Sequence, residues 1–247
     1  MKMEPDFLDR YQRQIQLSEI GLQGQQKLRD ARILVVGLGG LGCPVSQYLV
    51  MAGVGCIGLV DGDTVSLGNL QRQTLYRNDD VGKSKVQIAL QQLQSLNPSL
   101  EVLVFGTALT PENSLDIVGL FDLVIDCTDN FKTRYLINDV CAQLNKSWVY
   151  GSVSRFEGQV AVFNVNIRED GKAYSLNYRD VFPEMPKEGE VLACAETGVL
   201  GSVVGVVGSL QATEALKYFT GAGNLLCNQL LTYNALKQTL FTVKLSQ

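Results

Sequence analysis

Residues 32–42 read Arg-Ile-Leu-Val-Val-Gly-Leu-Gly-Gly-Leu-Gly, and this stretch decides the fold. Residues 32–37 form an apolar, β-branched run of the kind found in a central parallel strand covered on both faces. Gly37, Gly39 and Gly42 stand in the GxGxxG spacing and lead into apolar residues that repeat at helical intervals. Such glycines permit a tight turn in which backbone N–H groups and a helix N-terminus approach a phosphate. The stretch therefore predicts a strand, a nucleotide-binding turn and a helix, but it leaves the nucleotide open.

The alternation of strand and helix continues outward to residue 147. Apolar strand signals occupy residues 56–60, 101–106 and 122–127. Apolar residues at helical spacing occupy residues 41–52, 86–96 and 136–144. This order predicts an α/β fold, with a Rossmann-like, doubly wound and mostly parallel sheet.

The pattern changes in the C-terminal part. Residues 148–165 hold two strand-like runs with no helix between them, which predicts antiparallel strands. Residues 169–198 are polar and have no sustained period, and a loop of that length is usually functional or mobile. A glycine-rich helix is expected from Gly201, and residues 225–232 and 239–245 predict a closing hairpin.

We expect residues 1–247 to form a single domain, because the chain shows no repeat, low-complexity tract or linker. Its parts are a polar, helical arm (1–31), a nucleotide-binding part (32–147) and a C-terminal part with the long loop and the hairpin (148–247).

Composition excludes several classes of protein. Hydrophobic residues make up 46% and charged residues 19%, which excludes intrinsic disorder, and the net charge of −4 argues against nucleic acid or membrane partners. The absence of His excludes histidine bases and histidine metal sites. The six cysteines form no CxxC pair, and the N-terminus lacks the apolar segment of a secretory signal. Reduced thiols and a cytoplasmic location are therefore expected.

A polar segment after the second strand narrows the choice of nucleotide. Asp61 stands at the end of that strand, where an acid can hold a ribose hydroxyl. Asn69, Arg72 and Gln73 follow in a polar loop, and Lys85 lies in the first turn of the next helix. Two cations suit a triphosphate better than a nicotinamide, although each alone is more often a solvated surface charge. An NAD(P)-dependent oxidoreductase stays as the alternative.

The sequence Asp-Cys-Thr-Asp-Asn at residues 126–130 follows another parallel strand, where doubly wound sheets bind ligands. Asp129 is the candidate Mg²⁺ ligand because it lies beyond the strand, and Mg²⁺ is usually held by one or two carboxylates plus phosphate oxygens. A helix N-cap is the competing role for these residues, Asn130 included. The Gly-Lys-Ser at residues 82–84 is not a P-loop, because no strand precedes it and Arg77 stands where the first glycine belongs.

Cys194 lies near the end of the long polar segment, where an exposed thiol beside a helix start could act as a nucleophile. A lone cysteine is more often inert, and Cys43, Cys56 and Cys127 are expected to be buried small hydrophobes.

In this order, the motifs resemble those of the bacterial ThiF/MoeB/HesA adenylyltransferases, within the ubiquitin-activating-enzyme-like superfamily. The matching blocks are RYQRQI, VVGLGGLG, LVDGDTVSLGNLQRQTL, VGKSK, DCTDN and ETGVLGSVVGVVGSLQATEALK, from about residue 8 to residue 235. The resemblance implies that the chain binds Mg-ATP and a small ubiquitin-fold sulfur-carrier protein ending in Gly-Gly. It implies AMP transfer to the carrier's terminal carboxylate, release of pyrophosphate, and later thiocarboxylate formation with a sulfur donor such as a cysteine desulfurase.

The resemblance also gives roles to individual residues. Asp61 would hold the ribose, and Asp129 would hold Mg²⁺. Asn69, Arg72 and Lys85 would position and neutralise the phosphates, and residues 148–247 would bind the carrier. The implied nucleotide-binding set is Gly37, Gly39, Gly40, Gly42, Asp61, Gly68, Asn69, Leu70, Gln71, Arg72, Lys85, Asp129 and Asn130. The implied catalytic set is Arg13, Arg72, Lys85, Asp129 and Cys194, with Arg13 reaching the phosphates from the other subunit of a homodimer.

One feature departs from the family pattern. Most relatives hold a structural zinc with two CxxC pairs, whereas the first pair is replaced here by Asn-Tyr-Arg-Asp at residues 177–180 and the second does not occur before Gln247. We therefore expect no structural zinc. A catalytically inactive binding module and an RNA-modifying relative remain alternatives, disfavoured by the full set of charged residues and by the absence of a basic extension.

Overall fold

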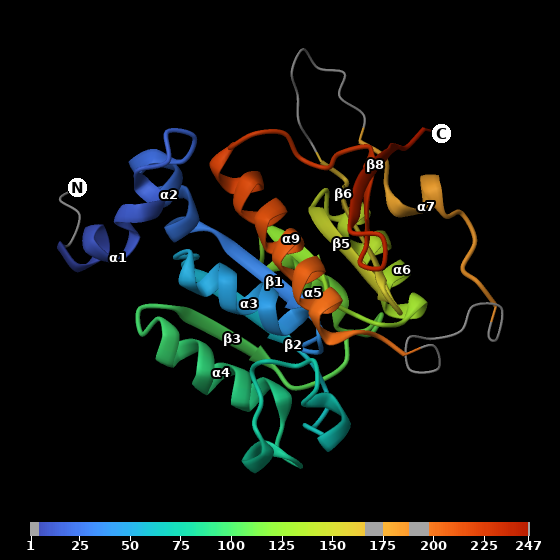
Figure 1. The fold of residues 1–247 in the computed structure, drawn as a ribbon, viewed down its shortest axis with the longest axis horizontal. Coiled ribbons are helices and arrows are strands. Elements are labelled where there is room, and N and C mark those ends of the chain that lie inside the picture. The colour runs from blue at the N-terminus through green and yellow to red at the C-terminus, as the bar shows by residue number, and fades with distance from the viewer. Residues whose placement is uncertain (1–4, 166–174, 188–197, 247) are drawn as a thin grey trace.

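The computed structural model describes residues 5–165, 175–187 and 198–246, and its strands form one sheet with helices on both faces (Figure 1). The strands run in the order β3-β2-β1-β4-β5-β6-β7-β8. Their bounds are β1 Arg32–Val36, β2 Cys56–Val60, β3 Glu101–Phe105, β4 Leu123–Asp126, β5 Ser147–Ser154, β6 Glu157–Phe163, β7 Gln229–Asn234 and β8 Thr239–Lys244. The pairings from β3 through β5 are parallel and those from β5 to β8 antiparallel, which confirms the predicted sheet.

The helices divide between the two faces of the sheet. Their bounds are α1 Pro5–Ile15, α2 Gly21–Asp30, α3 Gly42–Met51, α4 Lys85–Leu96, α5 Ser114–Gly119, α6 Phe131–Gln143, α7 Tyr178–Val181 and α9 Gly201–Thr220. Side chains of α3, α4 and α9 share one apolar core with the sheet, and those of α5, α6 and α7 share the other. Within the described residues, no helix is long and apolar enough to cross a membrane.

The strand order creates a switch point beside β1. The chain leaves β1 through α3 toward β2 and later returns through α5 to β4, on the other side of β1. Because the two connections diverge, the carboxyl ends of β1 and β4 form the edge at which open α/β sheets bind ligands, in the crevice expected there. The glycine turn and residues 126–130 both lie at this edge.

Three details differ from the sequence expectations. The chain between β3 and β4 contains the short helix α5, which the sequence analysis did not predict. Six residues are too few to show a helical repeat of apolar side chains. The first strand of the hairpin begins at Gln229 rather than at residue 225, because Asn228 adopts a left-handed φ of 54° that interrupts the extended chain. Cys127 lies just after β4 rather than within it.

Helix α9 packs close to its neighbours through small residues. A Cβ on Gly208 would lie 2.6 Å from Cγ of Pro44 in α3, and one on Gly201 would lie 2.6 Å from the carbonyl oxygen of Gln71. Gly205 differs, since a Cβ there would meet no heavy atom within 4 Å. Packing within the chain therefore explains why positions 201 and 208 are glycine, but it does not explain the glycine at position 205.

We predict that Gly58→Ala destabilises the sheet. Gly58 lies in β2, and an added Cβ would be 2.2 Å from Cζ of Phe121, in the core. Overpacking of this kind should lower the free energy of unfolding by about 1–3 kcal/mol. Urea titration checks this value, with Gly119→Ala as the control, because a Cβ on Gly119 meets open space. Equal stability of both variants would contradict the packing argument.

Candidate functional site

The glycine turn between β1 and α3 is as tight as the sequence predicts. Gly37 has a φ of +91°, and a Cβ on it would lie 2.7 Å from the carbonyl oxygen of Cys127. A Cβ on Gly42 would lie 2.0 Å from the carbonyl oxygen of Gly37. Neither position accepts a side chain, so the N-terminus of α3 opens directly onto the crevice.

Asp61 fixes the shape of this turn. Its Oδ2 accepts a hydrogen bond from the backbone N–H of Leu38 at 2.7 Å, and its Oδ1 accepts one from the N–H of Asp63 at 2.8 Å. Its side chain is only 9% exposed. The residue predicted to hold a ribose therefore also joins the ends of β1 and β2.

Lys85 is the first residue of α4, as expected, and its ammonium group lies between two carboxylates. Its Nζ is 2.8 Å from Oδ2 of Asp63 and 4.0 Å from Oδ2 of Asp61. The Lys85 side chain is 6% exposed, whereas that of Asp63 is 74% exposed. A cation is thus held at the edge of the crevice by one buried and one solvated partner.

The polar loop after β2 folds back on itself. The Asn69 side chain accepts a hydrogen bond from the backbone N–H of Ser66 at 3.2 Å, and Nη1 of Arg72 donates to the carbonyl oxygen of Gly68 at 3.0 Å. A Cβ on Gly40 would lie 2.6 Å from Val204 Cγ1 and 3.5 Å from Arg72, which places the loop, the glycine turn and α9 side by side. Leu70 and Gln71 continue the same loop.

Gln73 and Tyr76 extend the site beyond the residues predicted for it. Gln73 is buried, its Oε1 has no hydrogen-bond partner in the described structure, and its amide nitrogen lies 3.6 Å from where a Cβ of Gly39 would stand. Tyr76 donates to the carbonyl oxygen of Leu38 at 2.8 Å, and burial raises its pKa. Both side chains therefore pack against the glycine turn, Gln73 near Gly39 and Tyr76 at Leu38.

A buried ion pair supports residues 126–130. Nε of Arg134 lies 2.7 Å from Oδ2 of Asp126, and the Arg134 Nη2 donates to the carbonyl oxygens of Thr128 at 3.1 Å and Gly151 at 3.2 Å. Gln211 in α9 donates to the Asp126 carbonyl oxygen at 2.7 Å. Burial by itself would lower the pKa of Arg134, but the charge and hydrogen bond of Asp126, together with the nearby Tyr150 and Tyr178, raise that pKa above its usual value.

This network was not predicted, because the sequence gives no sign that Gln211 meets a residue 85 positions earlier. Arg134 is one of three charged residues of α6, with Lys132 and Asp139, so the sequence did not single it out. The Asp126 side chain is fully buried, so the network leaves Asp129 as the exposed carboxylate of the segment.

Asn130 serves as the N-cap of α6, the competing role considered from the sequence. Its Oδ1 accepts a hydrogen bond from the N–H of Thr133 at 2.9 Å. Asp129, immediately before it, is exposed at the carboxyl end of β4. Within the described residues no group of three acidic or cysteine side chains converges to form a metal cage. A lone carboxylate suits Mg²⁺ that is held mainly by phosphate oxygens.

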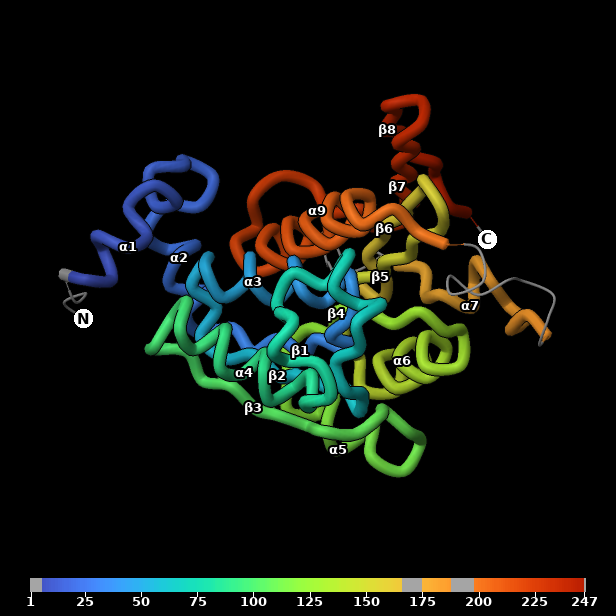
Figure 2. The backbone as a smooth tube through the Cα atoms, turned by 60° about the horizontal axis from the view of Figure 1, so that its bottom comes forward, coloured from blue at the N-terminus to red at the C-terminus, as the bar shows by residue number. Residues whose placement is uncertain are grey.

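Arg13 lies far from the turn of its own chain. In the same helix, α1, Gln14 donates to the carbonyl oxygen of Ala52, just past the C-terminal end of α3. The turn adjoins the other end of α3, a ten-residue helix about 15 Å long. Figures 1 and 2 show α1 beside α2 at one end of the molecule, and α2 leads directly into the start of β1. Arg13 is exposed and has no ion pair with any described residue.

The cysteines within the described residues are structural where they are buried. Burial raises the pKa of Cys43 to about 12 and that of Cys56 to about 11, and it also raises the pKa of Cys127. Buried neutral thiols are poor nucleophiles, which confirms the expected packing role. Cys194 lies outside the described residues.

The residues at 177–180, where the family resemblance implies a CxxC pair, cap a short helix. The Asn177 side chain accepts from the N–H of Arg179 at 2.8 Å, and Asp180 accepts from the N–H of Asn177 at 2.8 Å. Together they cap the short helix α7. These side chains supply no thiolate for zinc, so the donor set does not fit the metal.

Comparison with known proteins shows the family to which this chain belongs. A model of the ThiF family matches residues 11–247. The chain belongs to the ThiF family. This confirms the resemblance drawn from the sequence motifs.

Several relatives of this ThiF-family chain carry functional names. It is 48% identical to the sulfur carrier protein adenylyltransferase of Thermus thermophilus, over 96% of this chain and 87% of that protein. It is 45% identical to the probable adenylyltransferase/sulfurtransferase MoeZ of Mycobacterium tuberculosis, over 95% of this chain and 59% of that protein. It is 51% identical to the adenylyltransferase and sulfurtransferase uba4 of Emericella nidulans, over 87% of this chain and 45% of that protein. The chain thus spans only about half the length of the two sulfurtransferases.

Solved structures confirm the fold of the ThiF-family chain. PaaA matches with a TM-score of 0.82 at 20% identity, over 99% of this chain and 84% of that one. MccB of E. coli, solved with ATP, matches with a TM-score of 0.81 at 21% identity, over 99% of this chain and 74% of that one. At these identities the likeness concerns the fold alone.

We predict that Arg134→Met destabilises the chain far more than the loss of a surface ion pair. It leaves the buried Asp126 carboxylate without its partner, which should lower the free energy of unfolding by about 3–5 kcal/mol. The control is Arg179→Met, because the Arg179–Asp139 pair is exposed and should contribute no more than about 1 kcal/mol. Urea titration measures both values.

A third variant separates charge from packing. Arg134→Met combined with Asp126→Asn removes both charges and should recover part of the lost stability, since no uncompensated carboxylate remains buried. If the double variant is no more stable than Arg134→Met, the ion pair is not the reason for the loss.

Proposed function

We propose that the chain transfers AMP from ATP to the C-terminal glycine carboxylate of a small ubiquitin-fold sulfur-carrier protein and releases pyrophosphate. The observation that carries this proposal is the 48% identity to a sulfur carrier protein adenylyltransferase over 96% of the chain. The same name disfavours the NAD(P)-dependent oxidoreductase. The product, an acyl-adenylate, would then accept sulfur from a donor such as a cysteine desulfurase.

The reaction needs no nucleophile from the enzyme. One oxygen of the carrier carboxylate attacks the α-phosphorus of ATP, and the bond from that phosphorus to the bridging oxygen of the β-phosphate breaks. The electron pair leaves with pyrophosphate. Catalysis then consists of aligning the two substrates and offsetting the charge that develops on the phosphates.

The site offers groups for both tasks. The N-terminus of α3, opened by Gly37 and Gly42, presents backbone N–H groups to phosphates. Asp61 would accept a ribose hydroxyl while its backbone hydrogen bonds keep it in place. Arg72 and Lys85 supply positive charge at the same edge of the sheet.

A bound Mg²⁺ would neutralise phosphate charge and orient the triphosphate. Asp129 is its proposed protein ligand, because this carboxylate is exposed at the carboxyl end of β4 and forms no ion pair with another described residue. Asn130, as cap of α6, sets where the chain turns after Asp129.

The remaining assignments belong to the same proposal. We propose that the protein is a cytoplasmic homodimer without structural zinc and that residues 1–247 form a single domain. We also propose that any covalent role of Cys194 is confined to the sulfur-transfer step. Adenylation itself does not require that thiol, since the carrier carboxylate is the nucleophile.

We predict that Asp129→Ala lowers the rate of carrier-dependent ATP–pyrophosphate exchange by at least about 100-fold, the scale seen when a charge-stabilising group is removed. Thermal unfolding should change little, because Asp129 is exposed. Asp116→Ala on the exposed side of α5 is the matched control and should keep full exchange. Unchanged exchange in Asp129→Ala would remove this residue from the site.

We also predict that Arg13 completes the site of the other subunit. Arg13→Ala and Lys85→Ala should each be inactive alone, yet mixing them with subunit exchange should restore activity. Random pairing makes about half of the dimers mixed, each with one intact site of two, so about a quarter of all sites should recover. No recovery despite demonstrated exchange of subunits would place Arg13 outside the reaction.

A further inference from the structure

Both backbone polar groups of Leu38, in the glycine turn, are held by side chains of other segments. Its N–H donates to Oδ2 of Asp61 at 2.7 Å, and its carbonyl oxygen accepts from the Tyr76 hydroxyl at 2.8 Å. The Cys43 thiol also donates to that carbonyl oxygen, at a longer sulfur–oxygen distance of 3.6 Å. Leu38 and Tyr76 are buried, and burial raises the pKa of Tyr76, so the hydroxyl keeps its proton and remains a donor.

The hydrogen bond from Tyr76 determines where the next backbone N–H points. Leu38 and Gly39 share a trans peptide bond, in which the carbonyl oxygen and the N–H point in opposite directions within one plane. Because Tyr76 holds the Leu38 carbonyl oxygen toward the core, the Gly39 N–H points away from the core. Gly39 is partly exposed, and no described residue accepts its N–H. One backbone donor at the turn is thus left for a ligand.

The glycine at position 39 makes this peptide easy to rotate. A Cβ there would meet only the side-chain nitrogen of Gln73, at an ordinary contact distance of 3.6 Å, so packing does not require glycine. Glycine at this place lets the backbone approach a phosphate closely, but it also permits more backbone conformations than any other residue. Without the Tyr76 hydroxyl, the buried Leu38 carbonyl would lose its stronger donor, and rotation of the peptide would relieve that loss.

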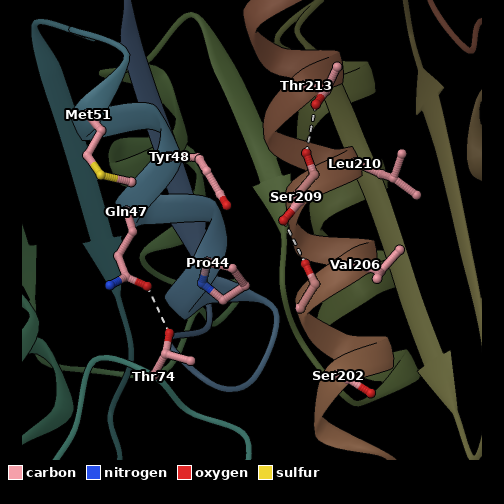
Figure 3. Close-up of a pocket in the computed structure, with 11 residues that line it drawn as sticks. Pro44, Gln47, Tyr48, Met51, Thr74, Ser202, Val206, Ser209, Leu210 and Thr213 are labelled. Atoms are coloured by element: carbon pink, nitrogen blue, oxygen red, sulfur yellow. Dashed lines mark hydrogen bonds between the residues drawn. The ribbon is translucent and has the colours of Figure 1, made fainter.

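Tyr76 is itself held in place by the polar loop that precedes it. Its backbone N–H donates to the Gln73 carbonyl oxygen at 3.3 Å. The Thr74 hydroxyl donates to Oε1 of Gln47 in α3 at 2.8 Å, which ties the loop to that helix (Figure 3). The Tyr76 side chain lies in the apolar core that α3 shares. The loop that carries Arg72 therefore also fixes the tyrosine that orients the turn.

We propose that Tyr76 is a positioning residue for the nucleotide: through the Leu38 carbonyl, its hydroxyl directs the Gly39 N–H toward the α-phosphate. The inference rests on the proposed function, since it needs a nucleotide at this turn. The α-phosphate is the phosphate concerned because it is attached to the ribose, and Asp61, the proposed ribose ligand, binds the residue next to Gly39. The same N–H would hold an oxygen on the phosphorus that the carrier carboxylate attacks.

The substitution Tyr76→Phe tests the proposal, because it removes one oxygen and keeps the ring that packs in the core. The matched control is Tyr135→Phe. Tyr135 is also buried, and its hydroxyl also contacts backbone carbonyl oxygens, those of Phe182 at 2.9 Å and Glu184 at 2.8 Å, but it lies in the other apolar core.

NMR titration of each protein with AMP and with adenosine separates the phosphate contact from the rest of the nucleotide. Tyr76→Phe should bind AMP at least about tenfold more weakly than the wild type does, the scale of one hydrogen bond to a charged group. It should bind adenosine as the wild type does, because adenosine has no phosphate. Tyr135→Phe should bind both as the wild type does. A merely structural loss would weaken both ligands together.

The Gly39 amide signal gives a second measurement in the same experiment. In protein labelled with ¹⁵N-glycine, its peak is the one missing from Gly39→Ala, a variant for which the turn has room. In the wild type and Tyr135→Phe, AMP should move this amide proton downfield, because a hydrogen bond to phosphate forms, and adenosine should not. In Tyr76→Phe the downfield shift should be lost, while the other glycine peaks show that the variant is folded.

Several outcomes overturn the proposal. Wild-type affinity of Tyr76→Phe for AMP, equal losses of affinity for AMP and adenosine, or an unchanged downfield shift of Gly39 would each do so. A wild type that binds neither AMP nor ATP would overturn it together with the proposed function. If Tyr76→Phe behaves as expected but the wild type shows no carrier-dependent exchange of pyrophosphate, the positioning role stands and the proposed function alone fails.

Discussion

The ion pair between Arg134 and Asp126 joins four elements at the carboxyl end of β4, beside the proposed nucleotide site. Its atoms contact the end of β4, the start of α6 and the middle of β5, and Gln211 ties the same point to α9. Two buried charges lose much of their hydration energy, so such a pair is a weak source of stability. Its effect is directional, because the guanidinium fork and the carboxylate accept few other arrangements. Residues 126–130 therefore leave the sheet in one conformation.

Sequence reasoning found those parts of the site that are local in the chain. The strands, the glycine turn and Lys85 at the start of α4 follow from patterns within a few residues, because period and backbone geometry act at short range. The antiparallel hairpin was found with its first strand displaced by a left-handed Asn228. Asn130 was expected in the nucleotide-binding set, and the structure shows its side chain capping α6.

The parts that sequence reasoning missed depend on distant contacts. Gln211 looks like one polar residue on a long helix until the fold brings it to Asp126. Gln73 was placed in the polar loop, but its burial beside the glycine turn depends on how that loop packs. Gly205 lies in the glycine-rich helix that the sequence predicts, but only the structure shows that a Cβ there would meet no heavy atom within 4 Å. Such features arise from packing between elements that are distant in the sequence, and this packing produces no repeating pattern of residues.

In the proposed nucleotide site, the pairing of Lys85 with Asp63 would influence which anions are retained. An arriving anion would displace a carboxylate that already lies 2.8 Å from the ammonium group, and Asp63 would regain full hydration on release, since it is 74% exposed. A weak, singly charged ion gains little from this exchange, whereas a polyphosphate brings several oxygens to the same cation and to the helix terminus beside it. The Asp63 carboxylate would thus compete with the ligand for the Lys85 ammonium group. In the proposed site, selectivity among anions would then come from the number of negative charges that one ligand brings.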